Sequence, residues 1–456
     1  MSDRKAAGRR PGVDIMDMEI SRDPLRLLVA ALIFLTVSRA HQHYGWLGAL
    51  HPADILFVGA LGFALVKRRT LSLGNVTATW HPKAIWGLGA LAILSVPFAL
   101  SMGTAGSFVV NALSKVLVSV ALILVTMRHP GDLKLYLWSY VLACGFLVYL
   151  SVSVFSLSQT GGMYRLGRLY MYDANGLGLV LSTGLPLCLV LFQNSAKLGK
   201  ITSGLILLGI GVSLARSGSR GGFLGLLAVG LMLLIVIRGV SIPKRVGFVG
   251  VVAAGLFLAA PPGYWSQMES LTEPTEDYNW TSPYGRKAVA ERGLGYMLNH
   301  PVTGVGVGNF PRAEGLLAEV SQERKAAGQG YRWTAAHNTY IQVGAELGIP
   351  GLLLYCVLLI GGALGLYRLR KRLPRGWRSA GGTPGLLYDL ALYLPVSYVG
   401  FAVTATFLSF AYHSIFYFLT IFAVGTYLGV RQVAQHHAAD QRPASRVAPR
   451  RVRQRS

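Results

Sequence analysis

The apolar residues of this chain are gathered in long runs that are separated by short polar connections. The runs are roughly 15 to 24 residues long, about the helix length that crosses a hydrocarbon core of roughly 30 Å. Strands of a membrane β-barrel would be roughly 10 residues long with alternating apolar and polar positions, and these runs do not alternate. The pattern therefore predicts an all-α polytopic membrane protein with about 12 transmembrane helices. The expected spans are residues 25–40, 48–66, 84–102, 107–127, 135–155, 176–192, 201–215, 221–238, 246–261, 341–366, 386–410 and 413–430.

The composition agrees with a membrane protein. Of the 456 residues, 52% are apolar and 14% are charged, whereas a soluble protein carries about 25% charged residues. The first apolar run continues directly into the multispan pattern, so we expect no secretory signal peptide. The three cysteines, Cys144, Cys188 and Cys356, fall inside apolar runs, and we interpret them as small core residues.

The net charge of +24 first suggests a nucleic-acid partner, but the distribution of the charge argues against one. With a cytoplasmic N-terminus, most of the 43 Lys and Arg residues fall in cytoplasmic segments, as the positive-inside rule requires. We therefore expect both termini in the cytoplasm and no nucleic acid as a partner. The expected divisions are a basic cytoplasmic N-terminus (1–24), spans 1 to 9 (25–261), a periplasmic loop domain (262–336), spans 10 to 12 (337–430) and a disordered basic tail (431–456).

Three outward connections break the charge rule. Arg165 and Arg168 lie between spans 5 and 6, Arg216 and Arg220 lie in the turn "SLARSGSRGG", and Arg286 is one of several cations in the long loop. Arginines at helix ends often do no more than reach the membrane interface. Cations kept on the outward face nevertheless favour an anion site there. If the helix continued through the short turn, the spacing of four would place Arg216 and Arg220 on one face.

The segment 262–336 is the one long connection, and a structureless loop of that length would be unusual. "GRKAVAERGLGYMLNH" (285–300) is typical of an amphipathic helix, and "AEGLLAEVSQERKAAG" (313–328) predicts a second helix. Between them, residues 299–311 are rich in glycine. We therefore expect a folded, helical loop domain between spans 9 and 10.

The sequence "HNTYIQVGAELGIPG" contains His-Asn followed, after nine residues, by two glycines three apart: His337, Asn338, Gly348 and Gly351. This pattern resembles the signature of O-antigen ligases and of the wider O-antigen ligase and polymerase superfamily. Three further segments are similar to the superfamily: "SGSRGG", "RLGRLYMYDANGLG" and "GRKAVAERGLGYMLNHPVTGVGVGNF". The motifs lie between residues 165 and 351, and the chain before them is similar by its span pattern.

The resemblance implies a GT-C-like glycosyltransferase of the bacterial inner membrane. Such an enzyme moves a glycan from undecaprenyl diphosphate to an acceptor sugar at the periplasmic face, and it needs neither a metal nor a nucleotide cofactor. The acceptor would be the lipid A core for a ligase, or another glycan for a polymerase of O-antigen or exopolysaccharide. The chemistry suits the residues, because arginine forks match phosphate oxygens and a histidine titrates near neutral pH.

By this resemblance His337 is the expected general base, which removes the proton of the acceptor hydroxyl. Arg216 and Arg220 are the first candidates to bind the diphosphate, and they would stabilise its charge as it leaves. The further expected diphosphate contacts are Arg165, Arg168 and Arg286, and the expected supporting residues are Asn338, Tyr340, Gly348 and Gly351. For Asn338 we favour a helix cap over a residue that orients His337.

A multispan transporter of small anions or other solutes is the alternative function. A carrier should show repeat symmetry and broken helices at mid-membrane, and we detect neither in the sequence. A non-catalytic scaffold would leave the arginine and histidine motifs unexplained. Lys115 and Glu346 are ionisable residues within expected spans, which makes them functional candidates by position. The sequence leaves their roles open, and Glu346 either pairs with an arginine or lies at the membrane interface.

Overall fold

The structure is a computed structural model of the 456-residue chain. It describes residues 23–440 except 161–162, 167–171, 237–240, 273–277 and scattered positions from 242 to 255. Arg168 and half of the expected span 246–261 therefore lie outside the described residues.

The described part of the chain is mostly helical. Its first half contains α1 (Pro24–Ser38), α2 (Ala40–His43), α3 (Gly45–Ala49), α4 (Pro52–Val66), α5 (Trp80–Leu94), α6 (Met102–Phe108), α7 (Ser114–Thr126) and α8 (Pro130–Tyr149). Its second half contains α9 (Ala174–Gln193), α10 (Lys197–Ser217), α11 (Arg220–Val236), α13 (Tyr264–Glu269), α14 (Tyr278–Thr281), α15 (Arg286–Asn299), α16 (Phe310–Leu316), α17 (Glu319–Ala326), α18 (Thr339–Arg372), α19 (Gly382–Ala405) and α20 (Ser414–Asp440).

Short elements complete the list. The 3₁₀ turns are η2 (Arg68–Thr70), η3 (Leu73–Thr77), η4 (Val96–Phe98) and η8 (Arg375–Arg378), and the π turns are η5 (Val109–Leu113) and η6 (Leu150–Val154). Strands β1 (Leu157–Thr160) and β2 (Met163–Leu166) form an antiparallel hairpin in which Ser158 lies opposite Arg165.

Within the part of the chain that the structure describes, seven helical stretches are long and apolar enough to cross a membrane, as an integral membrane protein requires: residues 102–126, 130–154, 174–193, 197–217, 339–372, 382–405 and 414–436. Shorter apolar helices, α1, α4 and α11, lie at three further expected spans. Each expected span overlaps described helical residues, although within 246–261 these are few, among them 256–259. The count of twelve stays a prediction. The fifth span begins earlier than the sequence predicted because Pro130 starts α8 and a capping box of His129 and Asp132 closes its first turn.

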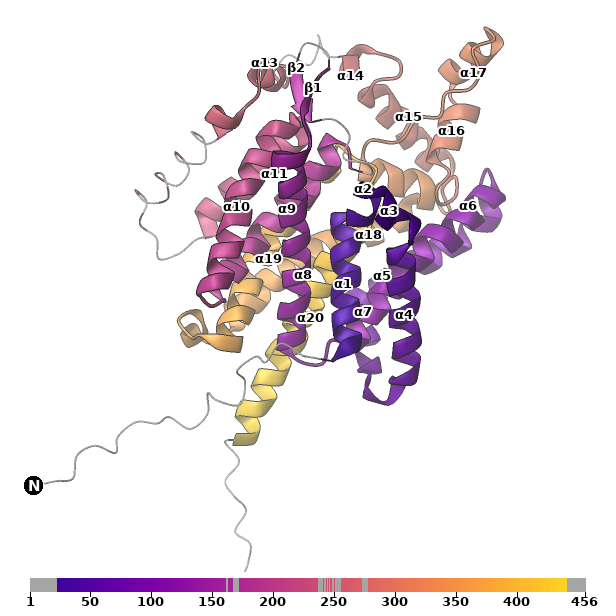
Figure 1. The fold of residues 1–456 in the computed structure, drawn as a ribbon. Coiled ribbons are helices and arrows are strands. Elements are labelled where there is room, and N and C mark those ends of the chain that lie inside the picture. Colours follow the sequence, from indigo (N-terminus) through magenta and orange to yellow (C-terminus); the bar gives the residue numbers. More distant parts are fainter. Residues whose placement is uncertain are drawn as a thin grey trace, which may run out of the picture.

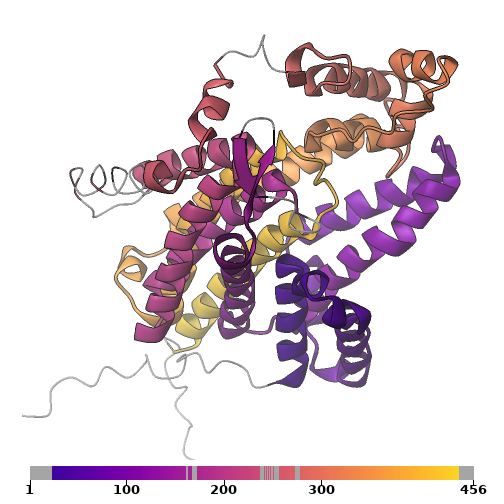
Figure 2. The same ribbon diagram turned by 45° about the horizontal axis from the view of Figure 1, so that its top comes forward.

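Figure 1 shows α13 to α17 and the β1–β2 hairpin at one end of the helix bundle. Turned in Figure 2, the helices of this segment, red to orange, lie across that end. We call this end of the bundle the site end. It is defined by the starts of α9 (Ala174), α11 (Arg220) and α18 (Thr339). The far end is the opposite one, where α9 ends at Gln193 and α19 begins at Gly382.

Small residues bring the central helices of the bundle close together. Helix α9 packs against α8, α10, α11 and α19, and most of its residues are buried. A Cβ atom on Gly184 would lie 2.6 Å from Sγ of Cys144, and one on Gly225 would lie 2.3 Å from Cγ2 of Thr404. Glycine at these positions therefore lets neighbouring helices approach each other, as is common in membrane proteins.

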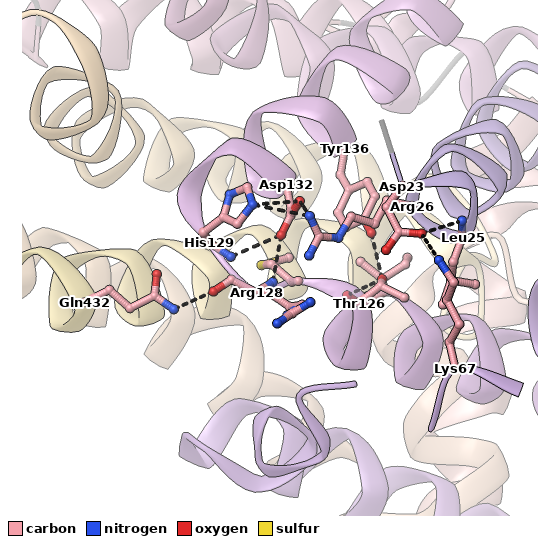
Figure 3. A network of polar contacts seen from close by, with 12 residues as sticks. Asp23, Leu25, Arg26, Lys67, Thr126, Arg128, His129, Asp132, Tyr136 and Gln432 are labelled. Atoms are coloured by element: carbon pink, nitrogen blue, oxygen red, sulfur yellow. Dashed lines mark hydrogen bonds and ion pairs between the residues drawn. The ribbon is translucent and has the colours of Figure 1, made fainter. Parts of the chain in front are cut away.

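A polar network joins α1, α8 and α20 at the far end (Figure 3). Arg26 forms an ion pair of 2.8 Å with Asp132, whose side chain is fully buried. The second carboxylate oxygen of Asp132 accepts hydrogen bonds from the backbone N–H groups of Arg128 and His129. Gln432 of α20 donates to the carbonyl oxygen of Arg128. Because both oxygens of the buried carboxylate have partners, the charge is compensated where the chain first enters the bundle.

Two boundaries differ from the sequence prediction. The helix expected over 313–328 is divided into α16 and α17, because Ala318 is extended and Gln322 donates to the carbonyl oxygen of Leu316, at the end of α16. The disordered tail was predicted to begin at residue 431. This boundary is too early, because α20 continues to Asp440. Its residues "RQVAQHHAAD" include good helix formers such as Ala, Gln and Arg, and Val433 packs into the core.

Candidate functional site

His337 lies directly before α18 in an unusual backbone conformation. Its φ of 48° is in the left-handed region, which a residue other than glycine seldom adopts. Its backbone N–H donates to Oγ of Ser409 at 2.9 Å. The next residue, Asn338, caps α18 by accepting from the N–H groups of Tyr340 and Ile341. Such strain persists only where the surroundings determine the conformation, so His337 is held in a defined position.

The connection between α19 and α20, residues 406–413, holds the start of α18 in place. Thr339 donates its hydroxyl hydrogen to the carbonyl oxygen of Leu408 and accepts from the N–H of Phe410. Tyr340, an expected supporting residue, donates its hydroxyl hydrogen to the carbonyl oxygen of Ala402. The position of His337 therefore depends on a segment about seventy residues later in the chain.

Two charged groups act on the His337 side chain. Burial lowers the pKa of His337 below its usual 6.5, the positive charge of Arg286 lowers it further, and the carboxylate of Asp173 opposes both. Asp173 is the N-cap of α9 and accepts from the N–H of Gly176 at 2.7 Å. A histidine that stays neutral near pH 7 is able to accept a proton, which is what a general base requires.

The basic turn after α10 lies against the start of α9. Gly218, with φ 60°, ends α10, and Arg220 begins α11. The hydroxyl of Ser219 donates to Oδ1 of Asn175. A Cβ atom on Gly178 would lie 2.7 Å from Cα of Gly222. This contact between the backbones of α9 and α11 brings Arg220 to the end of the bundle that carries Asp173 and His337.

The two arginines of this turn have different surroundings. Arg216 donates through Nε to the carbonyl oxygen of Ser151 at 2.8 Å and through Nη2 to that of Phe155 at 3.0 Å. These carbonyls belong to the end of the α8 and η6 helix, so Arg216 satisfies a helix C-terminus. Arg220 donates through Nη1 to Oγ of Ser270. The helix does not continue through Gly218, so the two arginines belong to separate helices instead of sharing one face.

Of the other three arginines expected at the site, one is near enough to His337 to affect its charge. Arg286 is the first residue of α15, and its charge reaches His337. Arg165 lies in β2 opposite Ser158, and no described contact joins it to His337. Arg168 lies outside the described residues.

The glycines of the sequence motif hold α18 against the loop domain. Gly348 has φ 68° and interrupts the helix, and a Cβ atom there would lie 2.5 Å from the carbonyl oxygen of Pro301. The N–H of Ile349 donates to that same oxygen. Gly304, in the glycine-rich turn, approaches the backbone of α18 just as closely. At Gly351 a Cβ atom would meet the side chain of Leu347 in its own helix.

Inside the loop domain a buried carboxylate joins α15 to α16. Glu314 accepts two hydrogen bonds from Arg292, at 3.0 and 2.6 Å, and one from the hydroxyl of Tyr296 at 2.9 Å. Arg292 also donates to the carbonyl oxygen of Pro283. A bidentate pair of this kind fixes orientation, so it holds the helix whose first residue is Arg286.

A cluster of residues that was not predicted from the sequence lies beside this site. Tyr172 donates its hydroxyl hydrogen to the carbonyl oxygen of Val37 at 3.0 Å, and its ring lies 5.9 Å from that of His413. Burial and the charge of Arg39 lower the pKa of His413 to about 3. Arg39 has φ 53°. It is the one Lys or Arg between residues 27 and 66, and that isolation was the available signal.

The intramembrane candidates Lys115 and Glu346 have protein partners. Lys115 forms a 2.7 Å ion pair with Asp54, and both side chains are about half exposed. Glu346 is 1% exposed and accepts from the backbone N–H of Phe310. Its partner is thus the loop domain, which neither sequence-based alternative anticipated. Among the described residues, no group of three or more His, Cys, Asp and Glu side chains is arranged to hold a metal ion.

Comparison with protein families finds a match for part of the chain. No curated protein matches the chain. Residues 204–356 match the family model for O-antigen ligase. This stretch runs from α10 into α18 and includes Arg220, Arg286 and His337. Residues 204–356 thus form an O-antigen ligase family domain, which supports the resemblance to the O-antigen ligase superfamily.

Proposed function

We propose that this protein transfers a glycan from undecaprenyl diphosphate to a hydroxyl group of an acceptor sugar at the periplasmic face of the inner membrane. The O-antigen ligase domain supports a membrane glycosyl-transfer role in polysaccharide assembly. The observation that carries the proposal is the placement of His337, whose pKa is lowered by burial and by Arg286, at the bundle end where α11 begins with Arg220.

In the proposed reaction His337 accepts the proton of the acceptor hydroxyl. The hydroxyl oxygen then attacks the anomeric carbon of the donor glycan and forms the new glycosidic bond. The bond between that carbon and the diphosphate oxygen breaks, and the diphosphate leaves with the bonding electrons. Arg286 and Arg220 stabilise the charge that collects on the leaving diphosphate. Asp173 stabilises the protonated form of His337 that results.

The surroundings of the arginines favour Arg220 over Arg216 as a diphosphate contact. Arg220 begins α11 where that helix meets the start of α9, next to Asp173, whereas Arg216 directs two of its N–H groups to the helix carbonyls of Ser151 and Phe155. Arg165 and Arg168 stay candidates for a second phosphate contact. In this proposal the segment 262–336 is periplasmic, both termini are cytoplasmic, the fold is GT-C-like, and no metal ion takes part.

Substitution of His337 tests the proposal in membrane vesicles that contain a lipid-linked glycan donor and an acceptor. We expect His337→Ala to lower transfer by about 10²- to 10⁴-fold, the usual contribution of a general base. His300→Ala is the matched control, since His300 is an exposed histidine at the end of α15. A His337→Ala variant that is present in the membrane and transfers glycan at the wild-type rate would refute the assignment.

Arg220→Lys tests the diphosphate contact separately. Lysine keeps the charge but loses the planar fork that matches phosphate, so the transfer rate should fall strongly. Arg312→Lys, at an arginine that bonds Thr104, is the control.

Deletion of the gene followed by analysis of the surface glycan separates the two activities. Single repeat units left on the lipid A core indicate a polymerase, and long chains that stay on the carrier lipid indicate a ligase.

A further inference from the structure

A cavity of about 460 Å³ lies at the far end of the bundle, away from His337. The turn after α9, the end of η8 and the start of α19 form its walls. The residues with polar side chains in its lining are Gln193, Asn194, Ser195, Arg378, Ser379 and Asp389. None of these residues takes part in the transfer reaction proposed above.

The cavity contains one positive and one negative side chain that are not joined to each other. Arg378 is exposed and lies close enough to act electrostatically on the Asp389 carboxylate, but the described residues include no ion pair between them. Asp389 accepts a hydrogen bond from Asn194 at Oδ2, 2.7 Å away. The buried hydroxyl oxygen of Ser195 has no hydrogen-bond partner in the part of the chain that the structure describes.

An exposed apolar surface begins beside the cavity. Leu198, Ile201, Leu205 and Leu208 of α10 are 77%, 51%, 64% and 69% exposed. Their spacing of three or four residues places them on one face of the helix. Ser195, in the cavity wall, precedes Leu198 by only three residues. In a bilayer such a face is covered by acyl chains, so a lipid lying along α10 would have its headgroup at the cavity.

We propose that this cavity binds the headgroup of phosphatidylethanolamine, with the phosphate at Arg378, the ammonium at Asp389 and an acyl chain along α10. A guanidinium matches phosphate oxygens, and a carboxylate accepts hydrogen bonds from an ammonium group. Because the cavity has a positive and a negative side chain that are not paired with each other, it favours a ligand with both a negative and a positive group. Phosphatidylglycerol has no cation for Asp389, and the quaternary ammonium of phosphatidylcholine has no N–H to donate.

Native mass spectrometry of the full-length protein tests this assignment. The purified protein is mixed with vesicles that contain equal amounts of phosphatidylethanolamine, phosphatidylglycerol and phosphatidylcholine, and the retained lipid is identified. We expect the wild type to retain phosphatidylethanolamine. Asp389→Asn keeps the shape of the side chain and should lower that retention about tenfold, the effect of losing one hydrogen bond to a charged group. Arg378→Gln should lower retention of all three phospholipids.

Arg375→Gln is the matched control, because Arg375 lies in the same 3₁₀ turn but does not line the cavity. It should behave as the wild type, and melting temperatures should show that all variants are folded. Equal retention of the three lipids by the wild type, or an unchanged preference in Asp389→Asn, would overturn the proposal. Soluble phosphoethanolamine that displaces the lipid at equal concentration would also overturn it, since the acyl chain along α10 would then contribute nothing.

Discussion

The contact between Gly178 and Gly222 leads to a prediction about both stability and activity. In Gly178→Ala the new Cβ atom would lie 2.7 Å from Cα of Gly222 and 3.3 Å from its nitrogen. Carbon atoms normally pack about 3.5–4.0 Å apart, so the starts of α9 and α11 must separate by about 1 Å. Both atoms belong to the backbone, so no side chain can rotate away to relieve the clash.

We expect Gly178→Ala to lower the free energy of unfolding by about 1–3 kcal/mol, as overpacking of a core does. The same displacement moves Arg220 relative to Asp173 and His337. A misplacement of about 1 Å can lower an enzymatic rate about 100-fold, so the glycan transfer rate should fall by that order. The assays are thermal unfolding of the purified protein and transfer in membrane vesicles.

Gly211→Ala is the control for this prediction. Gly211 lies inside α10, where a Cβ atom would meet nothing within 4 Å, and alanine there should stabilise the helix by about 0.5–1 kcal/mol. The reasoning is refuted if Gly178→Ala behaves as Gly211→Ala does, with a stability at or above the wild type and an unchanged transfer rate.

Three further predictions concern charged groups. Asp132→Asn should lower the free energy of unfolding by about 3–5 kcal/mol because it leaves Arg26 without its buried partner. Asp23→Asn removes a more exposed ion pair with Lys67 and should lower the free energy of unfolding by at most about 1 kcal/mol. If denaturant unfolding gives the same loss of stability for both variants, this difference is contradicted. The pKa of His337 is lowered, so transfer should persist as the pH falls to 6.5 and decline only below it, when the base becomes protonated. A pH–rate profile with its midpoint above 6.5 would count against that pKa shift. Glu314→Gln should destabilise the loop domain by about 2 kcal/mol, the loss of a hydrogen bond to a charged group. Limited proteolysis should then cleave the loop domain faster, and an unchanged cleavage rate would contradict the prediction.

Much of the helical architecture was predictable from local sequence. Long apolar runs identify membrane-spanning helices because a bilayer requires every backbone polar group to be satisfied within its own segment. The helix expected at 285–300 is confirmed as α15, Arg286–Asn299. Asn338 caps α18, as its residue type and position favoured. The match to the O-antigen ligase family confirms the resemblance that the motif around His337 suggested.

Other features of the candidate site were decided only by contacts between distant parts of the chain. The sequence offered Arg216 and Arg220 equally, but Ser151 and Phe155 engage Arg216, and these partners lie more than sixty residues away. The left-handed conformation of His337 is held by Ser409.

The break in α18 at Gly348 likewise depends on Pro301. Periodicity and motif spacing describe what a segment does on its own. They therefore predicted the helices and the resemblance to the family. The partners that engage Arg216, and the backbone conformation of His337, depend on the packing of helices against one another, which only the tertiary structure specifies.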